Sequence, residues 1–432
     1  MNIVEKHNDL IKIAADYGTP AYIYDESVII DNCKNLLSMP NAFGLNVRFA
    51  MKANSSKAIL QLIVQNGLEI DASSLNEARR AVLAGIPASK IMLTTQELPT
   101  GVDHTDLQSL ILDGMKYNVC SIRQFEAVKE FAKANDVKLS VRIHPGKGSG
   151  ESASRNTGDK YSCFGVHLEN LPHILEESER IGVIFDTVHV HIGSGGNPQD
   201  WKENIERELG FVRDFFPYAV KASFGGGLKV GRMPGEEDAD VAELGRYAKE
   251  MVQKFYEETG RKLITEIEPG TFVMAKAGLL LTKVIDKKST GKDGFEFIIT
   301  DGGMETNSRP LLYGSEHPFH IFSKEGELIS TEENVTSYDD VSERVIVGRC
   351  CETGDAQCLD ENGKIKPRNM GNPDIGDFIA IGGCGAYSPA LSPNNYNSHV
   401  SPSEVLIRAD KSVRLIRQKQ TLEQILVNEI GL

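Results

Sequence analysis

Short apolar runs alternate with amphipathic stretches between residues 45 and 280 of the 432-residue chain. The runs are rich in β-branched residues, which favour strands. They cover residues 47–53, 68–74, 91–95, 117–121, 138–145, 185–194, 220–228 and 263–270. Apolar residues at helical spacing lie between the runs, among others in residues 56–67, 74–85 and 125–134. About eight β-α units in roughly 230 residues match the size of a TIM (β/α)8 barrel, which is therefore the predicted α/β fold.

After residue 280 the pattern changes to strand-like runs with few helices between them. The runs cover residues 279–288, 295–303, 344–350, 377–383, 403–410 and 412–419. They predict a second, mostly β domain, a small barrel or sandwich, with a short helix over residues 421–430. The polar residues 321–340 and 359–374 are typical of loops or hairpins. We expect a barrel domain over residues 30–280 and a β-rich domain over residues 281–432, with residues 1–29 packed on the second.

Composition argues against several classes of protein, among them nucleic-acid-binding, membrane-spanning and secreted proteins. A net charge of −14 argues against binding to nucleic acid, whose phosphates need basic patches. No apolar run approaches the roughly 18 residues of a membrane helix, and the first residues lack the apolar segment of a signal peptide. The seven cysteines are scattered without a CxxC pair, so no metal site is predicted. These features predict a protein of the reducing cytoplasm.

Candidate chemistry gathers at the C-terminal ends of the predicted strands, where TIM barrels hold their active sites. The residues there are Lys52, Asp71, Ser73, His144, His191, Ser194, Gly225, Gly226, Gly227 and Glu268. A single lysine at a strand end usually extends its amine into solvent. If the amine is buried instead, its pKa falls and it can form an imine, which makes Lys52 a candidate nucleophile.

The other strand ends allow a structural and a functional interpretation. The three glycines 225–227 can form a tight turn, or their N–H groups can cradle a phosphate. Glu268 can cap a helix or face the nitrogen of a pyridine ring. His191 shares a strand face with His189 and can either pack in the core or cover a flat cofactor. Metal binding by these two histidines is not expected, because no third ligand follows at suitable spacing.

Two polar loops of the β-rich domain combine reactive side chains. GRCCETGD occupies residues 348–355, and GAYSPALSPNNYN occupies residues 385–397. A cysteine, a glutamate and a tyrosine in loops between strands indicate a functional site more than packing.

In chain order, these segments resemble the motifs of the fold-type III decarboxylases that depend on pyridoxal 5′-phosphate (PLP), and within them the diaminopimelate decarboxylase family. The matching segments are FAMKAN (49–54), HIGS (191–194), GGG (225–227), EPG (268–270), SRPLLYG (308–314), CETGD (351–355) and GAY (385–387). The resemblance implies the two-domain architecture of alanine racemase and PLP as cofactor. It also implies an enzyme of lysine biosynthesis that converts meso-diaminopimelate to L-lysine, as a homodimer with shared active sites.

The resemblance also assigns roles to individual residues. The residues implied to hold the cofactor are Lys52 as its Schiff-base lysine, His191 on its ring, Glu268 at its ring nitrogen, and Ser194, Gly225, Gly226, Gly227 and Tyr387 around its phosphate. The residues implied to bind the amino-acid substrate are Arg309, Tyr313, Glu352 and Tyr387. Cys351 is implied to act in catalysis, and the partner subunit would deliver it together with Glu352.

One position departs from the family pattern. Thr271 follows EPG, where the family usually has an arginine that helps to hold the phosphate or the distal end of the substrate. Losing a guanidinium at a carboxylate site is not a neutral change, so lysine, ornithine or a carboxylated polyamine such as carboxynorspermidine remain alternative substrates.

Three other activities remain as alternatives. A fold-type III racemase resembles the barrel too, but racemases place an arginine at the ring nitrogen, and Glu268 therefore favours decarboxylation. A non-catalytic homologue would not need to retain Lys52, Glu268 and Cys351 together. A Schiff-base aldolase on a bare barrel would need neither the β-rich domain nor Glu268 next to a phosphate loop.

Overall fold

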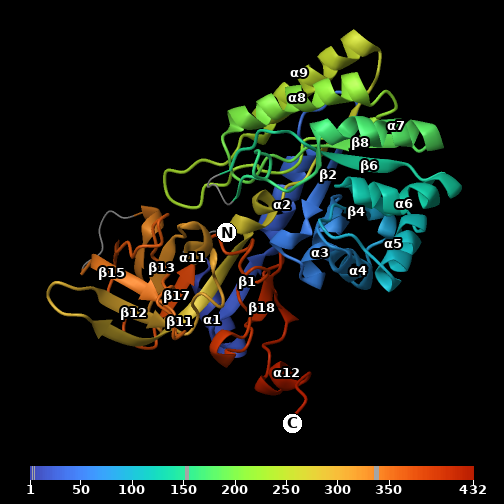
Figure 1. The fold of residues 1–432 in the computed structure, drawn as a ribbon. Coiled ribbons are helices and arrows are strands. Elements are labelled where there is room, and N and C mark those ends of the chain that lie inside the picture. Colours follow the sequence, from blue (N-terminus) through green and yellow to red (C-terminus); the bar gives the residue numbers. More distant parts are fainter. Residues whose placement is uncertain (2, 4, 151–154, 335–339) are drawn as a thin grey trace. The chain divides into compact units, whose positions relative to one another are not determined.

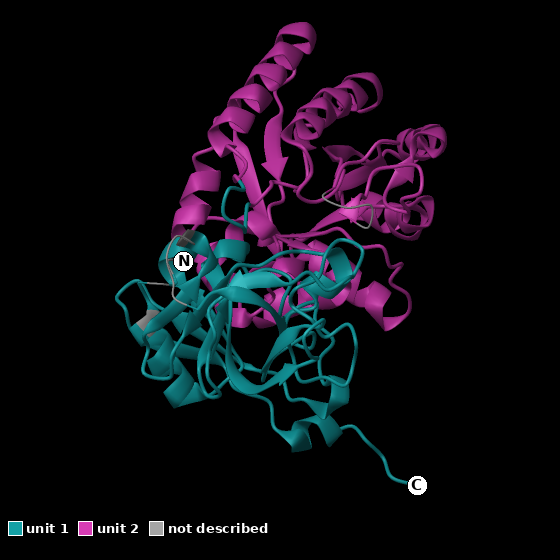
Figure 2. Cartoon of the chain, turned by 90° about the vertical axis from the view of Figure 1, so that its left-hand side faces the viewer, with its two compact units in different colours: residues 1–29, 231–236, 274–432 teal, residues 30–230, 237–273 magenta. Residues whose placement is uncertain are grey.

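The computed structural model describes residues 1, 3, 5–150, 155–334 and 340–432. The chain forms two compact units, which Figure 2 shows in different colours. The barrel unit comprises residues 30–230 and 237–273, and the β unit comprises residues 1–29, 231–236 and 274–432. The short segment 231–236 therefore belongs to the β unit, although the chain on both sides of it belongs to the barrel unit.

The barrel unit is built on a closed parallel sheet (Figure 1). Its strands are β2 (Leu45–Ala50), β3 (Glu69–Ala72), β4 (Ile91–Leu93), β5 (Lys116–Val119), β6 (Leu139–His144), β8 (Phe185–His189), β9 (Lys221–Ser223) and β10 (Ile264–Ile267). The order is β5-β4-β3-β2-β10-β9-β8-β6, and pairing of β5 with β6 closes the ring. The short strand β7 (Val166–His167) pairs with β6. The eight strands confirm the predicted TIM barrel, and closure places the first strand, β2, beside the last, β10.

Helices follow the barrel strands along the chain and surround the sheet (Figure 1). They are α3 (Lys57–Gln65), α4 (Leu75–Leu83), α5 (Val102–Leu112), α6 (Ile122–Ala134), α7 (Leu171–Ile181), α8 (Pro198–Phe215) and α9 (Val241–Thr259). Several begin at a side chain that accepts a hydrogen bond from the first turn, as Ser74 does from the N–H of Glu77 in α4. Among the described residues, no helix is long and apolar enough to cross a membrane.

The β unit contains a ten-stranded sheet in the order β14-β13-β17-β11-β1-β18-β19, extended from β11 by β12, β15 and β16. These strands are β1 (Ala21–Asp25), β11 (Gly278–Ser289), β12 (Glu296–Thr300), β13 (Phe319–Phe322), β14 (Leu328–Thr331), β15 (Ser342–Val347), β16 (Arg368–Met370), β17 (Phe378–Ile381), β18 (Ser403–Ile407) and β19 (Val413–Arg417). Its helices include α1 (His7–Tyr17), α11 (Arg309–Tyr313) and α12 (Leu422–Leu426), while α2 (Glu26–Leu37) and α10 (Thr271–Met274) cross from one unit to the other along the chain.

The core of the β unit lies around strand β1, all of whose residues are buried. This strand runs antiparallel to β11 and parallel to β18. Ile23 packs there with Leu279, Phe322 and Val405 in one apolar cluster. The N-terminal segment is therefore an integral part of this unit's sheet.

Candidate active site in the barrel mouth

Four neighbouring strands carry the predicted cofactor residues at their C-terminal ends. Lys52 follows β2, Glu268 follows β10, the glycines 225–227 follow β9, and His191 follows β8. The strands are adjacent in the order β2-β10-β9-β8, so closure of the barrel brings these segments to one side of its mouth. The C-terminal face is where TIM barrels hold their chemistry.

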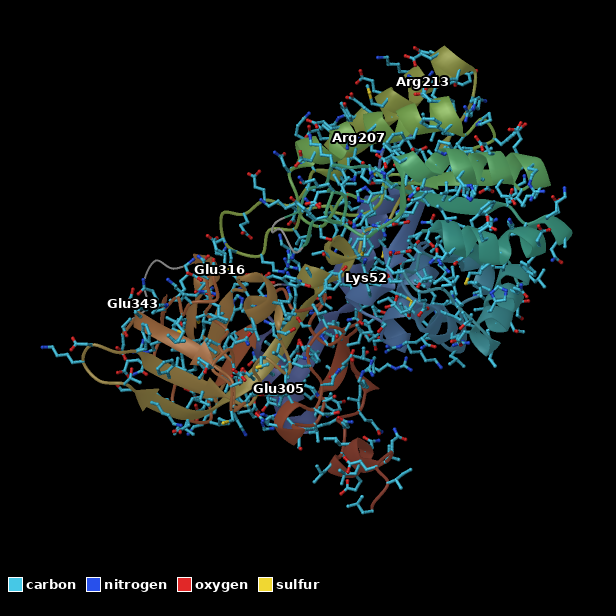
Figure 3. All side chains as sticks on the ribbon, viewed as in Figure 1. Lys52, Arg207, Arg213, Glu305, Glu316 and Glu343 are labelled. Carbon is cyan, nitrogen blue, oxygen red and sulfur yellow. The ribbon has the colours of Figure 1, made fainter. Side chains whose placement is uncertain are left out.

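Lys52 lies in a single 3₁₀ turn, Met51–Ala53, directly after β2 (Figure 3). Its side chain is exposed in this structure, so the burial on which one interpretation of Lys52 depended is not observed. Its charge acts instead on the titration of nearby groups, among them the buried carboxyl of Asp71. Burial first, and the negative charge of Glu268 second, raise the pKa of Asp71 well above its ordinary value. The carboxyl of Asp71 is therefore protonated more readily than an ordinary aspartate.

The ring of His191 is held by the glycine loop. Its Nδ1 accepts a hydrogen bond from the Gly226 N–H at 3.1 Å. Burial, followed by the positive charges of Arg142 and Lys52, lowers the pKa of His191 well below its ordinary value. His191 is therefore a neutral, flat ring whose proton sits on Nε2. Such a ring can lie against an aromatic cofactor without adding charge.

Backbone approach makes each glycine of the loop necessary. A Cβ on Gly226 would lie 2.4 Å from the carbonyl oxygen of Glu268, and one on Gly227 would lie 2.5 Å from that of Gly193. Gly225 and Gly227 also have positive φ angles of 66° and 96°. The Gly226 N–H donates to His191 in this structure, so Gly225 and Gly227 are the members of the loop whose N–H groups are the candidates for binding a phosphate.

A partly open pocket lies beside this loop. Its lining includes Gly226, Gly227 and Lys229 as well as Asn197, the N-cap of the 18-residue helix α8. The positive end of a helix dipole, a glycine loop and a lysine together favour binding of an anion such as a phosphate. Ser194 lies nearby in the chain, half-buried, with its backbone N–H donating to the Arg155 carbonyl at 3.2 Å. The residues present thus fit a phosphorylated cofactor.

Glu268 is buried, and its carboxylate has two partners. Oε2 lies 2.9 Å from Nε2 of His189, and Oε1 accepts from the Ser223 hydroxyl at 3.3 Å. Burial opposes ionisation, but the charge and hydrogen bond of His189, together with Arg142, outweigh it and lower the pKa of Glu268. The mouth therefore offers a carboxylate that stays ionised and can hold a proton on a cationic ring nitrogen.

Sequence reasoning missed two groups of this site, His189 and Arg142. Arg142 lies on β6, is only 6% exposed, and stacks 4.8 Å above the centre of the Phe164 ring. Its charge reaches both Glu268 and His191. The alternation of His189 with His191 is visible in the sequence, but a core histidine shows the same pattern.

The predicted substrate residues lie in the β unit. Arg309 is 2% exposed at the start of α11; its guanidinium donates to the Ser315 hydroxyl at 3.2 Å and lies 5.8 Å from the centre of the Tyr313 ring. Tyr387 is half-buried and has a positive φ of 59°, which is uncommon outside glycine and concentrates at functional sites.

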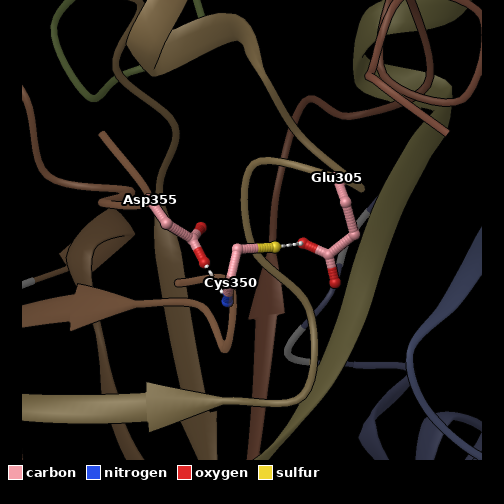
Figure 4. Close-up of side chains that lie close together, drawn as sticks. All are labelled: Glu305, Cys350 and Asp355. Carbon is pink, nitrogen blue, oxygen red and sulfur yellow. Dashed lines mark hydrogen bonds between the residues drawn. The ribbon is translucent and has the colours of Figure 1, made fainter. Parts of the chain in front are cut away.

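The loop that carries Cys351 and Glu352 is anchored by its neighbours. Cys350 Sγ donates to Glu305 at 3.4 Å, and the Cys350 N–H donates to Asp355 at 2.7 Å (Figure 4). Donor atoms of Glu305, Cys350 and Asp355 lie within 4.8 Å of one another, a spacing that a metal ion could use. Hydrogen bonds from the surrounding backbone already engage both carboxylates, so the cluster is explained as the anchor of an exposed loop.

Comparison with known proteins agrees with this geometry. The family model "Pyridoxal-dependent decarboxylase, pyridoxal binding domain" matches residues 29–275. Diaminopimelate decarboxylase of Buchnera aphidicola subsp. Baizongia pistaciae is 31% identical, over 98% of this chain and 96% of the relative. The enzyme of the same name from Escherichia coli K12 is 30% identical over the same shares. A crystal structure of a diaminopimelate decarboxylase matches with a TM-score of 0.87 and 28% identity, over 98% of this chain and 96% of that one. The chain therefore belongs to the PLP-dependent decarboxylases, and within them to the diaminopimelate decarboxylase family.

Proposed function

We propose that this chain removes the carboxyl group at one end of meso-diaminopimelate to give L-lysine, with PLP bound to Lys52. The observation that carries the proposal is the arrangement of Lys52, Glu268, the glycine loop and His191 on four adjacent barrel strands. Relatives named diaminopimelate decarboxylase at 30–31% identity, over 98% of the chain, support the choice of substrate.

Within this proposal each of the barrel residues has a separate role toward the cofactor. When bound, PLP supplies an electron sink for the charge that the departing CO2 leaves at Cα. The ionised Glu268 would hold a proton on the ring nitrogen and so strengthen that sink. The neutral ring of His191 would cover the cofactor face, and the glycine loop with Ser194 would hold the phosphate. Lys52 would bind the cofactor through its amine and, once the substrate amine has replaced it, could return a proton to Cα.

The β unit would supply recognition of the substrate's distal end. The buried guanidinium of Arg309 suits a carboxylate, because a planar fork can donate two parallel hydrogen bonds. Tyr313 and Tyr387 would line the same subsite. Thr271 favours a second candidate, decarboxylation of lysine, ornithine or a carboxylated polyamine, because its short hydroxyl cannot replace a guanidinium at a distal carboxylate.

We further propose a homodimer with shared sites in the cytoplasm. Cys351 and Glu352 have exposed side chains on an anchored loop, which suits a loop that completes the site of a partner subunit. Cys351 would then donate a proton to the substrate. All seven cysteines are free thiols, which fits a reducing compartment.

Borohydride reduction of the purified holoenzyme tests the cofactor assignment. It should fix PLP on the peptide that contains Lys52, and Lys52→Ala should lose both the label and the visible absorbance. A label on another lysine would refute the assignment. CO2 release from meso-diaminopimelate, lysine, ornithine and carboxynorspermidine then separates the two substrate classes: meso-diaminopimelate should be turned over fastest.

Mixing two inactive variants tests the shared sites. Lys52→Ala and Cys351→Ala should complement after subunit exchange, because a mixed dimer has one site with both changes and one with neither. Up to about a quarter of wild-type activity should return if exchange is statistical. No recovery, despite exchange shown by mass spectrometry of differently tagged chains, would place both residues in the same chain's site or remove Cys351 from catalysis.

A further inference from the structure

The first histidine of the HVH segment, His189, makes one side-chain hydrogen bond among the described residues, and it is to the carboxylate that the proposed function places at the cofactor ring. His189 ends strand β8, and its Nε2 lies 2.9 Å from Oε2 of Glu268. His189 is 1% exposed and Glu268 is 8% exposed. A carboxylate can only accept, so the shared proton belongs to Nε2 of the imidazole. In a site closed to water, a hydrogen bond of this kind fixes both the carboxylate and the ring.

The other ring nitrogen shows what holds this histidine in place. Nδ1 of His189 is buried and has no hydrogen-bond partner among the described residues. Buried polar atoms in native proteins are nearly always paired, so the single hydrogen bond to Glu268 is the polar contact that orients the His189 ring among the described residues. Glu268 is therefore the group that the His189 side chain serves.

The same carboxylate is also tied to the strand between them. Ser223 ends β9, pairs with His189 across the β8–β9 ladder, and donates its hydroxyl to Oε1 of Glu268. Three adjacent strands, β8, β9 and β10, thus contribute to the position of one carboxylate. The Ser223 contact is the longer, at 3.3 Å against 2.9 Å, so His189 is the main constraint on the orientation of the carboxylate.

We propose that His189 is a positioning residue that acts through Glu268: its Nε2–H holds one carboxylate oxygen, so that the carboxylate stays ionised and oriented to keep a proton on the cofactor ring nitrogen. The inference rests on the proposed function, because it needs Glu268 at the ring nitrogen. In this proposal His189 acts on Glu268 alone, whereas His191, which accepts from the glycine loop, would cover the cofactor. The two histidines of one motif therefore have separate tasks.

The test uses holoenzyme loaded with PLP that carries ¹⁵N in its ring, because the ¹⁵N chemical shift reports protonation of that nitrogen directly. His189→Phe should move the resonance toward the unprotonated value. It should also lower kcat by about ten- to a hundred-fold while KM changes much less, the range seen when a supporting hydrogen bond to an active-site ligand is lost. His189→Gln keeps an amide N–H near the position of Nε2, so it should recover part of both effects.

Two further variants make the outcome decisive. His320→Phe is the control, because His320 is also fully buried and has one side-chain hydrogen-bond partner, but belongs to the β unit, where its Nε2 lies 3.8 Å from Glu333. It should leave the ¹⁵N resonance unchanged. Glu268→Gln should move the resonance fully to the unprotonated value. If Glu268→Gln moves it and His189→Phe and His189→Gln do not, the inference on His189 is wrong and the proposed function stands. If Glu268→Gln also leaves it in place, the assignment of Glu268 fails and the inference falls with it.

Discussion

Removing one charge below the active site should destabilise the barrel unit strongly. Glu266 is fully buried on β10, one layer below Glu268. Its Oε1 accepts from Arg48 on β2 at 3.0 Å and from Lys221 on β9 at 2.9 Å. Arg48 is 2% exposed and also pairs with Glu69 on β3 at 2.7 Å. Glu266→Gln keeps the shape of the side chain but leaves these cations without their buried counter-charge.

The magnitude follows from the pKa of Glu266. Burial would raise this pKa, but the charges and hydrogen bonds of Arg48 and Lys221 outweigh burial and lower it from 4.5 to about 2. Each pKa unit corresponds to about 1.4 kcal/mol, so the ionised form is favoured in the folded state by about 3 kcal/mol. Loss of one partner from a buried ion pair costs ~3–5 kcal/mol in other proteins, which agrees. We expect Glu266→Gln to lower the unfolding free energy by about 3 kcal/mol near neutral pH.

The chain contains a convenient probe for this unit alone. Trp201 is its single tryptophan, is 4% exposed on α8, and belongs to the barrel unit. Its fluorescence during urea unfolding therefore follows the barrel unit, whatever the β unit does. Glu258 supplies the control, because it is exposed and forms only a surface ion pair with Arg213, at 3.7 Å. Glu258→Gln should leave the urea midpoint unchanged.

The pH dependence separates charge loss from a packing defect. A carboxyl whose pKa is lowered by folding contributes its stability fully above its unfolded pKa, and this contribution disappears as the pH falls toward the folded value. The difference between wild type and Glu266→Gln should therefore be full near pH 7 and about 1 kcal/mol smaller near pH 3.5. A cost below about 1 kcal/mol near neutral pH, or a cost that does not change with pH, would refute the reasoning.

Two further predictions concern Glu208 on α8 and Gly226 in the glycine loop. Glu208 is fully buried on this helix, and burial, then the charge of Glu268, raise its pKa well above the ordinary value. Because the pKa is raised by folding, wild type loses stability as the pH rises above 4.5. The stability of Glu208→Gln relative to wild type should therefore be greater at pH 8 than at pH 5, as measured by urea unfolding followed at Trp201. An equal difference at both pH values would contradict this. Gly226→Ala should weaken PLP binding at least about ten-fold, measured by absorbance titration, because its Cβ meets backbone at 2.4 Å. Gly210→Ala, whose Cβ meets nothing within 4 Å inside α8, should bind PLP normally and gain up to about 1 kcal/mol of stability.

The apolar pattern predicted the barrel strands but ran past their ends, by the largest margin at β8 and β9. The run 185–194 was expected to be one strand, yet β8 ends at His189, and the run 220–228 contains only Lys221–Ser223 as β9. Val190 and Phe224, just beyond these ends, are fully buried. Apolar residues report burial rather than ladder hydrogen bonds, so a buried loop continues the strand signal.

Edge strands of the β unit escaped sequence reasoning for the opposite reason. β14 ends the order of the main sheet, and β16 pairs with β15 at the end of the branch from β11. Both fall in the polar segments 321–340 and 359–374, for which a loop and a hairpin were both expected. The first segment does contain the second strand of a hairpin, because β14 pairs antiparallel with β13, and its residues 335–339 lie outside the described part of the chain. Edge strands carry polar residues because one side of their backbone has no neighbouring strand, so composition does not separate them from loops.

The motifs drew attention to Lys52, His191 and Glu268, which the fold places after adjacent barrel strands, but not to the partners that set their charge. Neither the lysine nor the glutamate can be judged from its own segment. The pKa of Glu268 depends on His189 and Arg142, which come from other strands, and the exposure of Lys52 depends on a 3₁₀ turn that a strand pattern hides. Pairings between distant segments decide both, and a single sequence does not contain them.

The buried ion pair of Arg48 and Glu266 and the candidate active site both involve strands β2 and β10, which pair where the barrel closes. Strands β2 and β10 are the first and the last of the barrel, and their register pairs Glu266 with Asn46. Arg48 binds Glu266 across this seam, and the same two strands carry Lys52 and Glu268 at their C-terminal ends. A slip by one residue would turn every side chain of a strand to the other face. It would separate Arg48 from Glu266 and would also change the position of Lys52 relative to Glu268. Glu266 therefore helps to fix the register of β2 and β10, on which the positions of Lys52 and Glu268 depend. A variant that weakens the pairing of these two strands should lose PLP affinity as well as stability.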